Sequence, residues 1–131
     1  MAALTTKALD TDEILALVKT ALSWDVHGAG LPAVEDALSM AQELTSYGRG
    51  IVEDLRTQCL DILADSEVAV RAQATLGEAS RRLYLRPLEG SASPRSAAQR
   101  AQNLARLVQS LLRAVVQVDQ AQTLITTKGT Q

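Results

Sequence analysis

The sequence predicts an all-α protein, an antiparallel four-helix bundle whose second and fourth helices are long. Two segments, residues 34–62 and 97–125, place apolar or small side chains at alternating steps of four and three residues, the spacing that lines one side of an α-helix. Hydrophobic residues make up 47% of the chain, aromatic residues make up only 2%, and phenylalanine is absent. The core is therefore aliphatic, which suits closely packed helices. We expect residues 1–131 to form a single domain of about the usual size.

The first helix is predicted over residues 11–24. Asp10 and Glu13 have the spacing of a capping box, in which an N-cap acceptor and a carboxylate three residues later each bind a backbone N–H group. Gly28 and Gly30 indicate where the helix has ended, because two glycines so close together destabilise a helix and suit a turn.

The second helix is predicted over residues 32–64, beginning with Pro32 in the first turn, where proline is tolerated. Gly48 and Gly50 interrupt it with two residues of low helix propensity. The four-three register nevertheless continues unchanged across both glycines, and an inserted loop would normally shift it. We therefore expect one continuous helix.

The third helix is predicted over residues 67–85, with an N-cap supplied by Asp65 or Ser66. Glutamate precedes arginine by four residues at two places on this helix, an orientation that stabilises a helix by a few tenths of a kcal/mol. These pairs are Glu67 with Arg71 and Glu78 with Arg82.

A flexible linker is expected over residues 87–94, and the fourth helix over residues 95–124 after an N-terminal cap at Ser93. The apolar arc of this helix covers roughly 200°, whereas a surface helix needs about 100°. Its solvent stripe is formed by Gln99, Gln102, Arg106, Gln109, Arg113 and Gln120. Either this helix is the central member of the bundle, or it also buries a face against a second copy of the chain. For the second alternative the expected interface residues are Leu107, Leu112 and Val116.

Few side chains suit catalysis. His27 is the single histidine and lies in a glycine-rich turn, so neither a two-histidine metal site nor a di-iron motif can form. Cys59, the single cysteine, falls in the core register of the second helix, where a thiol is inert. We expect no catalytic residue, no metal site and no cofactor, and favour a protein that is not an enzyme.

A ligand site between helices is the alternative interpretation. Gly48 and Gly50 are explained by close approach of another helix or by a bend, but their missing side chains would also leave room for a small anionic or aromatic molecule. Arginine forks suit carboxylates and phosphates, although nearby glutamates can neutralise them instead. The candidate ligand-binding residues are Trp24, Tyr47, Arg49, Arg82 and Tyr84.

The charge pattern bears on partners and location. A net charge of −2 disfavours nucleic-acid binding, which relies on many phosphate contacts. The N-terminal residues lack a basic segment followed by an apolar run, and no stretch approaches the ~18 apolar residues of a membrane span. We expect a cytoplasmic protein without a membrane partner, which associates with itself or with another protein.

Several motifs carry a family resemblance. The run Gly77–Leu83, the gap of proline and small residues after it, and the run 104–106 before an apolar helix are similar to a family of small actinobacterial proteins of unknown function, labelled natural-product biosynthesis proteins. The pair Arg49-Gly50 resembles the start of an earlier Arg-Gly-His-Ile motif of that family, and Ile51 stands in place of its histidine. The similarity covers residues 44–116, and residues 111–116 have no counterpart of a later segment bearing histidine and cysteine. The resemblance implies an all-helical fold and a setting in specialised metabolism, and carries over no catalytic residue.

Three functional hypotheses follow, of which the weakest is a nucleic-acid-binding regulator, since it would need the arginines of the third and fourth helices on one face. The other two are favoured over it. The first is a non-catalytic binding or accessory protein that acts through helix–helix association as a homodimer. The second is a small enzyme or ligand carrier with a pocket between helices.

Overall fold

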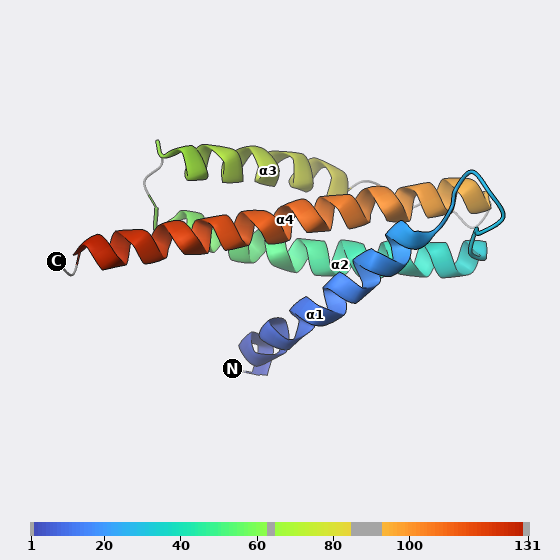
Figure 1. The fold of residues 1–131 in the computed structure, drawn as a ribbon, viewed down its shortest axis with the longest axis horizontal. Coiled ribbons are helices and arrows are strands. Elements are labelled where there is room, and N and C mark those ends of the chain that lie inside the picture. The colour runs from blue at the N-terminus through green and yellow to red at the C-terminus, as the bar shows by residue number, and fades with distance from the viewer. Residues whose placement is uncertain (1, 63–64, 85–92, 130–131) are drawn as a thin grey trace. The chain divides into compact units, whose positions relative to one another are not determined.

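Four α-helices make up the described part of the chain, as predicted, and the bundle is all-α (Figure 1). The computed structural model describes residues 2–62, 65–84 and 93–129, with side chains described over residues 11–62, 65–84 and 93–122. No strand occurs among these residues. The helices are α1 (Ala2–Ser23), α2 (Val34–Cys59), α3 (Glu67–Leu83) and α4 (Pro94–Gly129). Most of the expected linker, residues 87–92, lies outside the described residues.

Three helix ends differ from the predicted ends by more than about two residues. α1 begins at Ala2, so Asp10 lies inside the helix and does not cap it; no glycine or proline precedes it to stop the helix. α2 ends at Cys59 because the chain tightens there, with three successive backbone N–H groups bonding three residues back, beginning with Leu60 to Thr57 at 3.2 Å. α4 continues to Gly129, beyond the expected end at residue 124.

The two serine caps are formed. The Ser66 hydroxyl oxygen accepts a hydrogen bond from the backbone N–H of Ala69 at 3.1 Å at the start of α3. The Ser93 hydroxyl oxygen accepts one from the backbone N–H of Ser96 at 3.0 Å at the start of α4. Each bond supplies an acceptor to an N–H group that has no partner inside its helix, which explains why these helices begin where they do.

The chain forms two compact units. Unit 1 comprises Met1–Tyr47 and Arg86–Gln109, and unit 2 comprises Gly48–Leu85 and Ser110–Gln131. α2 and α4 therefore each contribute one segment to unit 1 and one to unit 2. No helix in the described part of the chain has the length and apolarity needed to cross a membrane.

Unit 1 is built from α1 and the first segments of α2 and α4. Its core is aliphatic and rich in alanine, which lets helix backbones approach closely. α1 contributes Ile14, Val18 and Ala21; α2 contributes Ala37, Ala41 and Leu44; α4 contributes Ala97, Ala98, Ala101, Leu104, Ala105, Leu107 and Val108. Within this unit the wide apolar arc of α4 is thus buried by its own chain, the first of the two alternatives that the sequence left open.

Gln102 was expected in the solvent stripe of the fourth helix, and the structure corrects this. Gln102 is only 5% exposed. Its side-chain amide nitrogen donates to the backbone carbonyls of Ala21 at 3.0 Å and Trp24 at 2.7 Å. These carbonyls lie at the C-terminal end of α1, where helix acceptors lack intrahelical donors. A buried glutamine is stable here because α1 supplies its partners.

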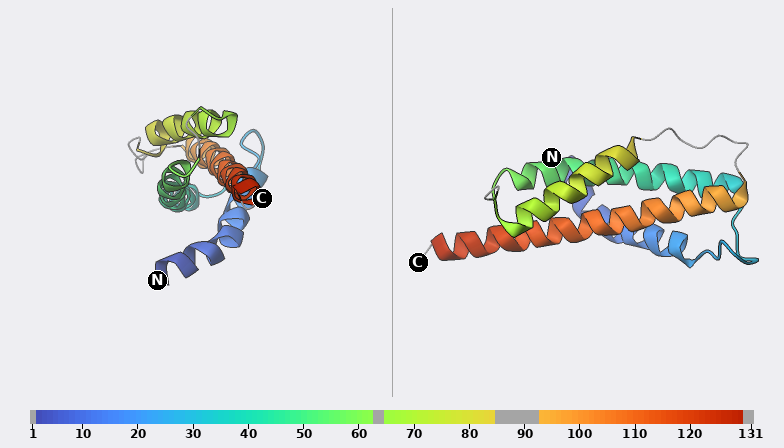
Figure 2. Two further views of the ribbon diagram at one scale, coloured as in Figure 1. Left: turned by 90° about the vertical axis from the view of Figure 1, so that its left-hand side faces the viewer. Right: turned by 90° about the horizontal axis from the view of Figure 1, so that it is seen from above.

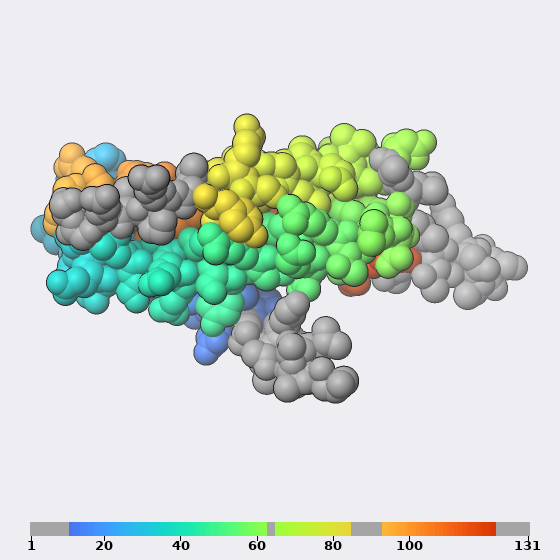
Figure 3. Space-filling model, turned by 180° about the vertical axis from the view of Figure 1, so that it is seen from behind, coloured from blue at the N-terminus to red at the C-terminus, as the bar shows by residue number. Residues whose placement is uncertain are grey.

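Unit 2 contains α3 and the second segments of α2 and α4, and Figures 1 and 2 show α3 beside both segments. α3 runs antiparallel to α2, since Arg49 contacts Leu83 whereas Arg56, two turns later, donates to the Ser80 hydroxyl at 2.9 Å. Figure 3 shows the surfaces of α2 and α3 in contact. The core contains Ile51, Val52, Leu55, Ile62, Ala69, Ala72, Leu76, Ala79, Leu83, Leu111, Ala114 and Val118.

α2 is continuous through both glycines, as the unbroken register predicts. Gly48 is buried, and a Cβ atom added there would lie 2.8 Å from Cδ2 of Leu83, closer than real contacts allow. A Cβ atom at Gly50 would meet nothing within 4 Å. Close approach of another helix therefore explains Gly48, whereas Gly50 has no such packing reason.

The two glycines should respond differently to alanine. Gly50→Ala should raise the free energy of unfolding by about 1 kcal/mol, because alanine has the higher helix propensity and space is available. Gly48→Ala should lower it by about 1 kcal/mol, because the cost of displacing buried Leu83 exceeds that gain. Chemical denaturation of both variants checks this, and equal stabilisation by the two would contradict the close contact with α3.

Candidate functional site

Of the five predicted ligand-binding residues, the structure brings Arg49 and Tyr84 into contact. The guanidinium carbon of Arg49 lies 4.4 Å from the centroid of the Tyr84 ring, within cation–π range. The same guanidinium donates from Nε at 3.3 Å and from Nη2 at 2.9 Å to the backbone carbonyl of Leu83. Arg49 therefore binds the last residue of α3 and the residue after it.

This contact stabilises the end of α3. The last carbonyls of a helix lack intrahelical donors and attract cations. Arg49, projecting from α2, supplies the donors for Leu83 while Gly48 beside it lets Leu83 approach. The segment Gly48-Arg49-Gly50 thus attaches the end of α3 to α2. The Nε and Nη2 donors of Arg49 are both occupied by the protein itself.

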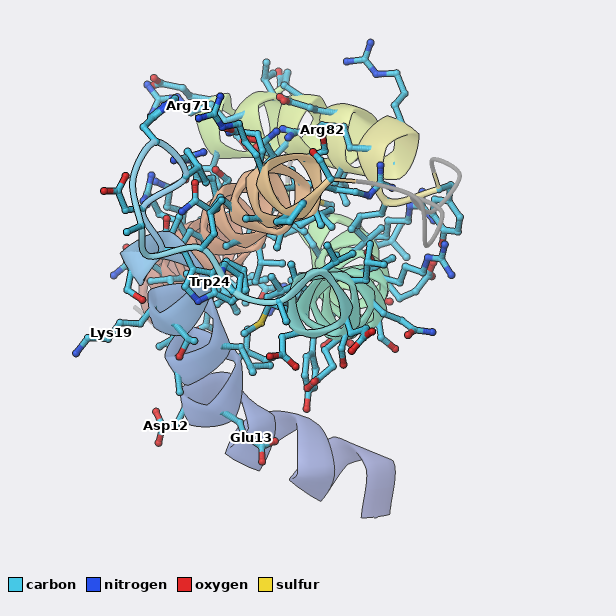
Figure 4. The ribbon with its side chains drawn as sticks, turned by 90° about the vertical axis from the view of Figure 1, so that its right-hand side faces the viewer. Asp12, Glu13, Lys19, Trp24, Arg71 and Arg82 are labelled. Atoms are coloured by element: carbon cyan, nitrogen blue, oxygen red, sulfur yellow. The ribbon has the colours of Figure 1, made fainter. Side chains whose placement is uncertain are left out.

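Arg82 is also engaged. Its Nη1 atom lies 3.2 Å from Oε1 of Glu78, the pairing predicted from the sequence. Arg71 makes the equivalent pair with Glu67. These ion pairs are largely exposed to solvent, so each contributes only a few tenths of a kcal/mol. Figure 4 shows both arginines projecting from α3.

Trp24 and Tyr47 belong to unit 1 and have partners there. Trp24 is half-buried after the end of α1, where its backbone carbonyl accepts from Gln102 at 2.7 Å (Figure 4). The Tyr47 hydroxyl donates to Oε2 of Glu13 at 3.2 Å, which joins α2 to α1. In unit 1 these two aromatic residues take part in contacts between helices.

The three expected interface residues differ in exposure. Leu107 is 4% exposed and belongs to the core of unit 1. Leu112 is half-buried, and Val116 is 54% exposed on the second segment of α4. Only the latter two present apolar surface to solvent.

The sequence predicts a position in a turn for the single histidine and an inert core position for the single cysteine. His27 is exposed in the turn after α1, and its backbone N–H donates to Oδ1 of Asp25 at 3.0 Å. Cys59 is half-buried at the end of α2, and burial raises the pKa of its thiol. The thiol is therefore protonated at neutral pH, which lowers its reactivity. Over residues 11–62, 65–84 and 93–122, no three His, Cys, Asp or Glu side chains are placed to hold a metal ion.

One concave feature was not predicted. A groove of about 320 Å³ lies between α3 and α4 in unit 2. The sequence places arginines on both helices. It does not show which of them face each other, because that depends on the register between α3 and α4. The groove is lined by Arg71, Ala74, Thr75, Ser110, Arg113, Ala114 and Gln117.

These features define a small helical protein in which most of the candidate residues hold helices together. The chain belongs to a family of unknown function (DUF6415), which matches residues 12–120. No curated protein and no solved structure matches the chain.

Removal of the Arg49 side chain should weaken the attachment of α3. Arg49→Ala should lower the free energy of unfolding by about 1 kcal/mol, because it removes the donors to Leu83 and the contact with Tyr84. Arg106→Ala is the control, since exposed Arg106 bonds Asn103 on its own helix, and it should change stability by less than about 0.5 kcal/mol. Urea denaturation compares them, and equal effects would contradict the capping role.

Proposed function

We propose that this protein is a non-catalytic helical binding protein that forms a homodimer through the second segment of α4. One observation carries the proposal: a face of α4 that is buried in unit 1 continues along the helix into unit 2, where half-buried Leu112 and exposed Val116 present apolar surface. The protein would act by presenting and pairing helix surfaces.

The repeat of α4 identifies this face. Ala98, Ala105 and Leu112 follow one another at steps of seven residues. Val116 follows Gln102 after two such steps. In unit 1 the face is buried, with Ala98 and Ala105 at 0% and Gln102 at 5% exposure. In unit 2 the same register places half-buried Leu112 and 54% exposed Val116. We call Leu112 and Val116 the α4 patch.

A second copy of the chain is the occupant that we propose for the α4 patch. The patch continues the register of the face on which α1 packs, so its side chains already have the spacing that receives a helix. Two identical patches can cover each other about a twofold axis, the commonest symmetry of soluble oligomers. Covering both would remove apolar surface from water, at about 25 cal/mol per Å².

The contacts that the candidate ligand-binding residues make with the protein itself support a non-catalytic function. Arg49 bonds the end of α3, Tyr47 bonds Glu13, and Arg82 pairs with Glu78. Three of the five side chains predicted to bind a ligand thus join helices or pair along one helix. A ligand carrier remains the second candidate, and the groove between α3 and α4 is the observation that favours it.

The proposed setting is specialised metabolism, with another protein of such a pathway as the alternative partner. It rests on the resemblance of residues 44–116 to proteins labelled for natural-product biosynthesis. We also propose a cytoplasmic location, as the composition of the chain led us to expect.

Light scattering coupled to size-exclusion chromatography tests the dimer. The protein should elute at twice the mass of one chain at tens of micromolar, and Val116→Glu should shift it to the monomer because a charge then occupies the buried contact. Val70→Glu is the matched control, since Val70 is 57% exposed on α3 and the substitution is identical. It should leave the dimer intact.

Two results would overturn the proposal. The first is a monomeric unaltered protein at these concentrations. The second is a Val116→Glu variant that stays dimeric and has a helical circular dichroism spectrum. Dissociation by Val70→Glu alone would instead place the interface on α3.

A further inference from the structure

We propose that the groove between α3 and α4 binds the phosphate group of a small phosphorylated molecule. This site lies in unit 2 and is distinct from the α4 patch, so it does not depend on the proposed dimer. It gives the protein a small-molecule ligand of defined chemistry.

The groove combines opposed positive charge with neutral donors. Arg71 reaches it from α3 and Arg113 from α4. The Ser110 hydroxyl and the Gln117 amide add hydrogen-bond donors from α4. Ala74 and Ala114 add only short side chains to the lining. Donors from two helices therefore line an open groove of about 320 Å³, at the lower end of ligand-site volumes.

The arginines retain donors for a ligand. No hydrogen bond or ion pair involves Arg113 in the part of the chain that the structure describes. Arg71 engages Glu67 through Nη2, which leaves its Nε and Nη1 groups. The Thr75 hydroxyl donates to the backbone carbonyl of Arg71 at 3.1 Å and so supports the turn that carries this arginine. The lining contains two arginines and no carboxylate, and its own charge is positive.

A phosphate fits this arrangement better than a carboxylate does. A carboxylate is planar, and one guanidinium fork satisfies both of its oxygens. A phosphate monoester presents three terminal oxygens in different directions and carries nearly two negative charges at pH 7. It can therefore accept from Arg71, Arg113 and Ser110 together. The space left beside a phosphate accommodates a small attached group.

Isothermal titration calorimetry with inorganic phosphate and pyrophosphate tests the site at low ionic strength. We expect saturable one-to-one binding, tighter for pyrophosphate, and an increase in Kd of about tenfold or more for both Arg113→Gln and Arg71→Gln. Arg81→Gln is the control, because Arg81 is exposed on α3 outside the groove and its loss changes the net charge equally. Its Kd should stay within about twofold of the original.

Three results would overturn the proposal: no saturable binding, an equal loss for Arg81→Gln, or succinate binding as tightly as pyrophosphate. Circular dichroism confirms that each variant is folded, and Ser110→Ala gives a milder test, with a Kd increase of about threefold. Val116→Asn removes apolar surface from the α4 patch without placing a carboxylate one turn from Arg113. It should bind pyrophosphate unchanged, so failure of the dimer and failure of this site are distinguishable.

Discussion

The burial of one narrow, aliphatic seam on α4 is the interaction on which the rest of the structure depends. Ala97, Ala101, Leu104, Val108, Leu111 and Val118 are each at most 4% exposed. In unit 1 the seam belongs to the core with α1 and α2, and in unit 2 to the core with α2 and α3. With almost no aromatic residues, this core gains stability from close contact of short side chains, which makes it sensitive to added volume. Gly48 against Leu83 is one example.

Polar side chains fasten the ends of the helices around that seam. Gln102 bonds the carbonyls at the end of α1, Arg49 bonds the end of α3, and Gln122 donates to the carbonyl of Gln58 at 3.3 Å near the end of α2. Each donor comes from a neighbouring helix and reaches a carbonyl at a helix end, where the regular donor four residues later is missing. The carbonyls of Ala21 and Gln58 also accept from the backbone N–H groups of Trp24 and Asp61. The same small set of polar groups therefore stabilises the fold, and the two surfaces that we propose for binding are the α4 patch and the groove between α3 and α4.

Local rules predicted the helices, the two serine caps and the continuity of α2, because these depend on spacing within one segment. Contacts between helices were harder to predict from the sequence. Gln102 has the periodicity of a solvent residue, and only the position of α1 reveals why it is buried. Arg49 and Tyr84, predicted as ligand-binding residues, lie in contact with each other, and this contact depends on where α3 ends. The groove could not be predicted, since its arginines are 42 residues apart in sequence and meet through tertiary packing.

We infer that the two units unfold as one domain, because α2 and α4 pass through both without interruption. Native-state hydrogen exchange along α4 tests this most directly. The account predicts that the slowest amides of the segments 101–109 and 110–118 exchange with the same free energy, equal to that of global unfolding. A difference of about 2 kcal/mol or more between the two segments would contradict it, and would show that each unit opens alone.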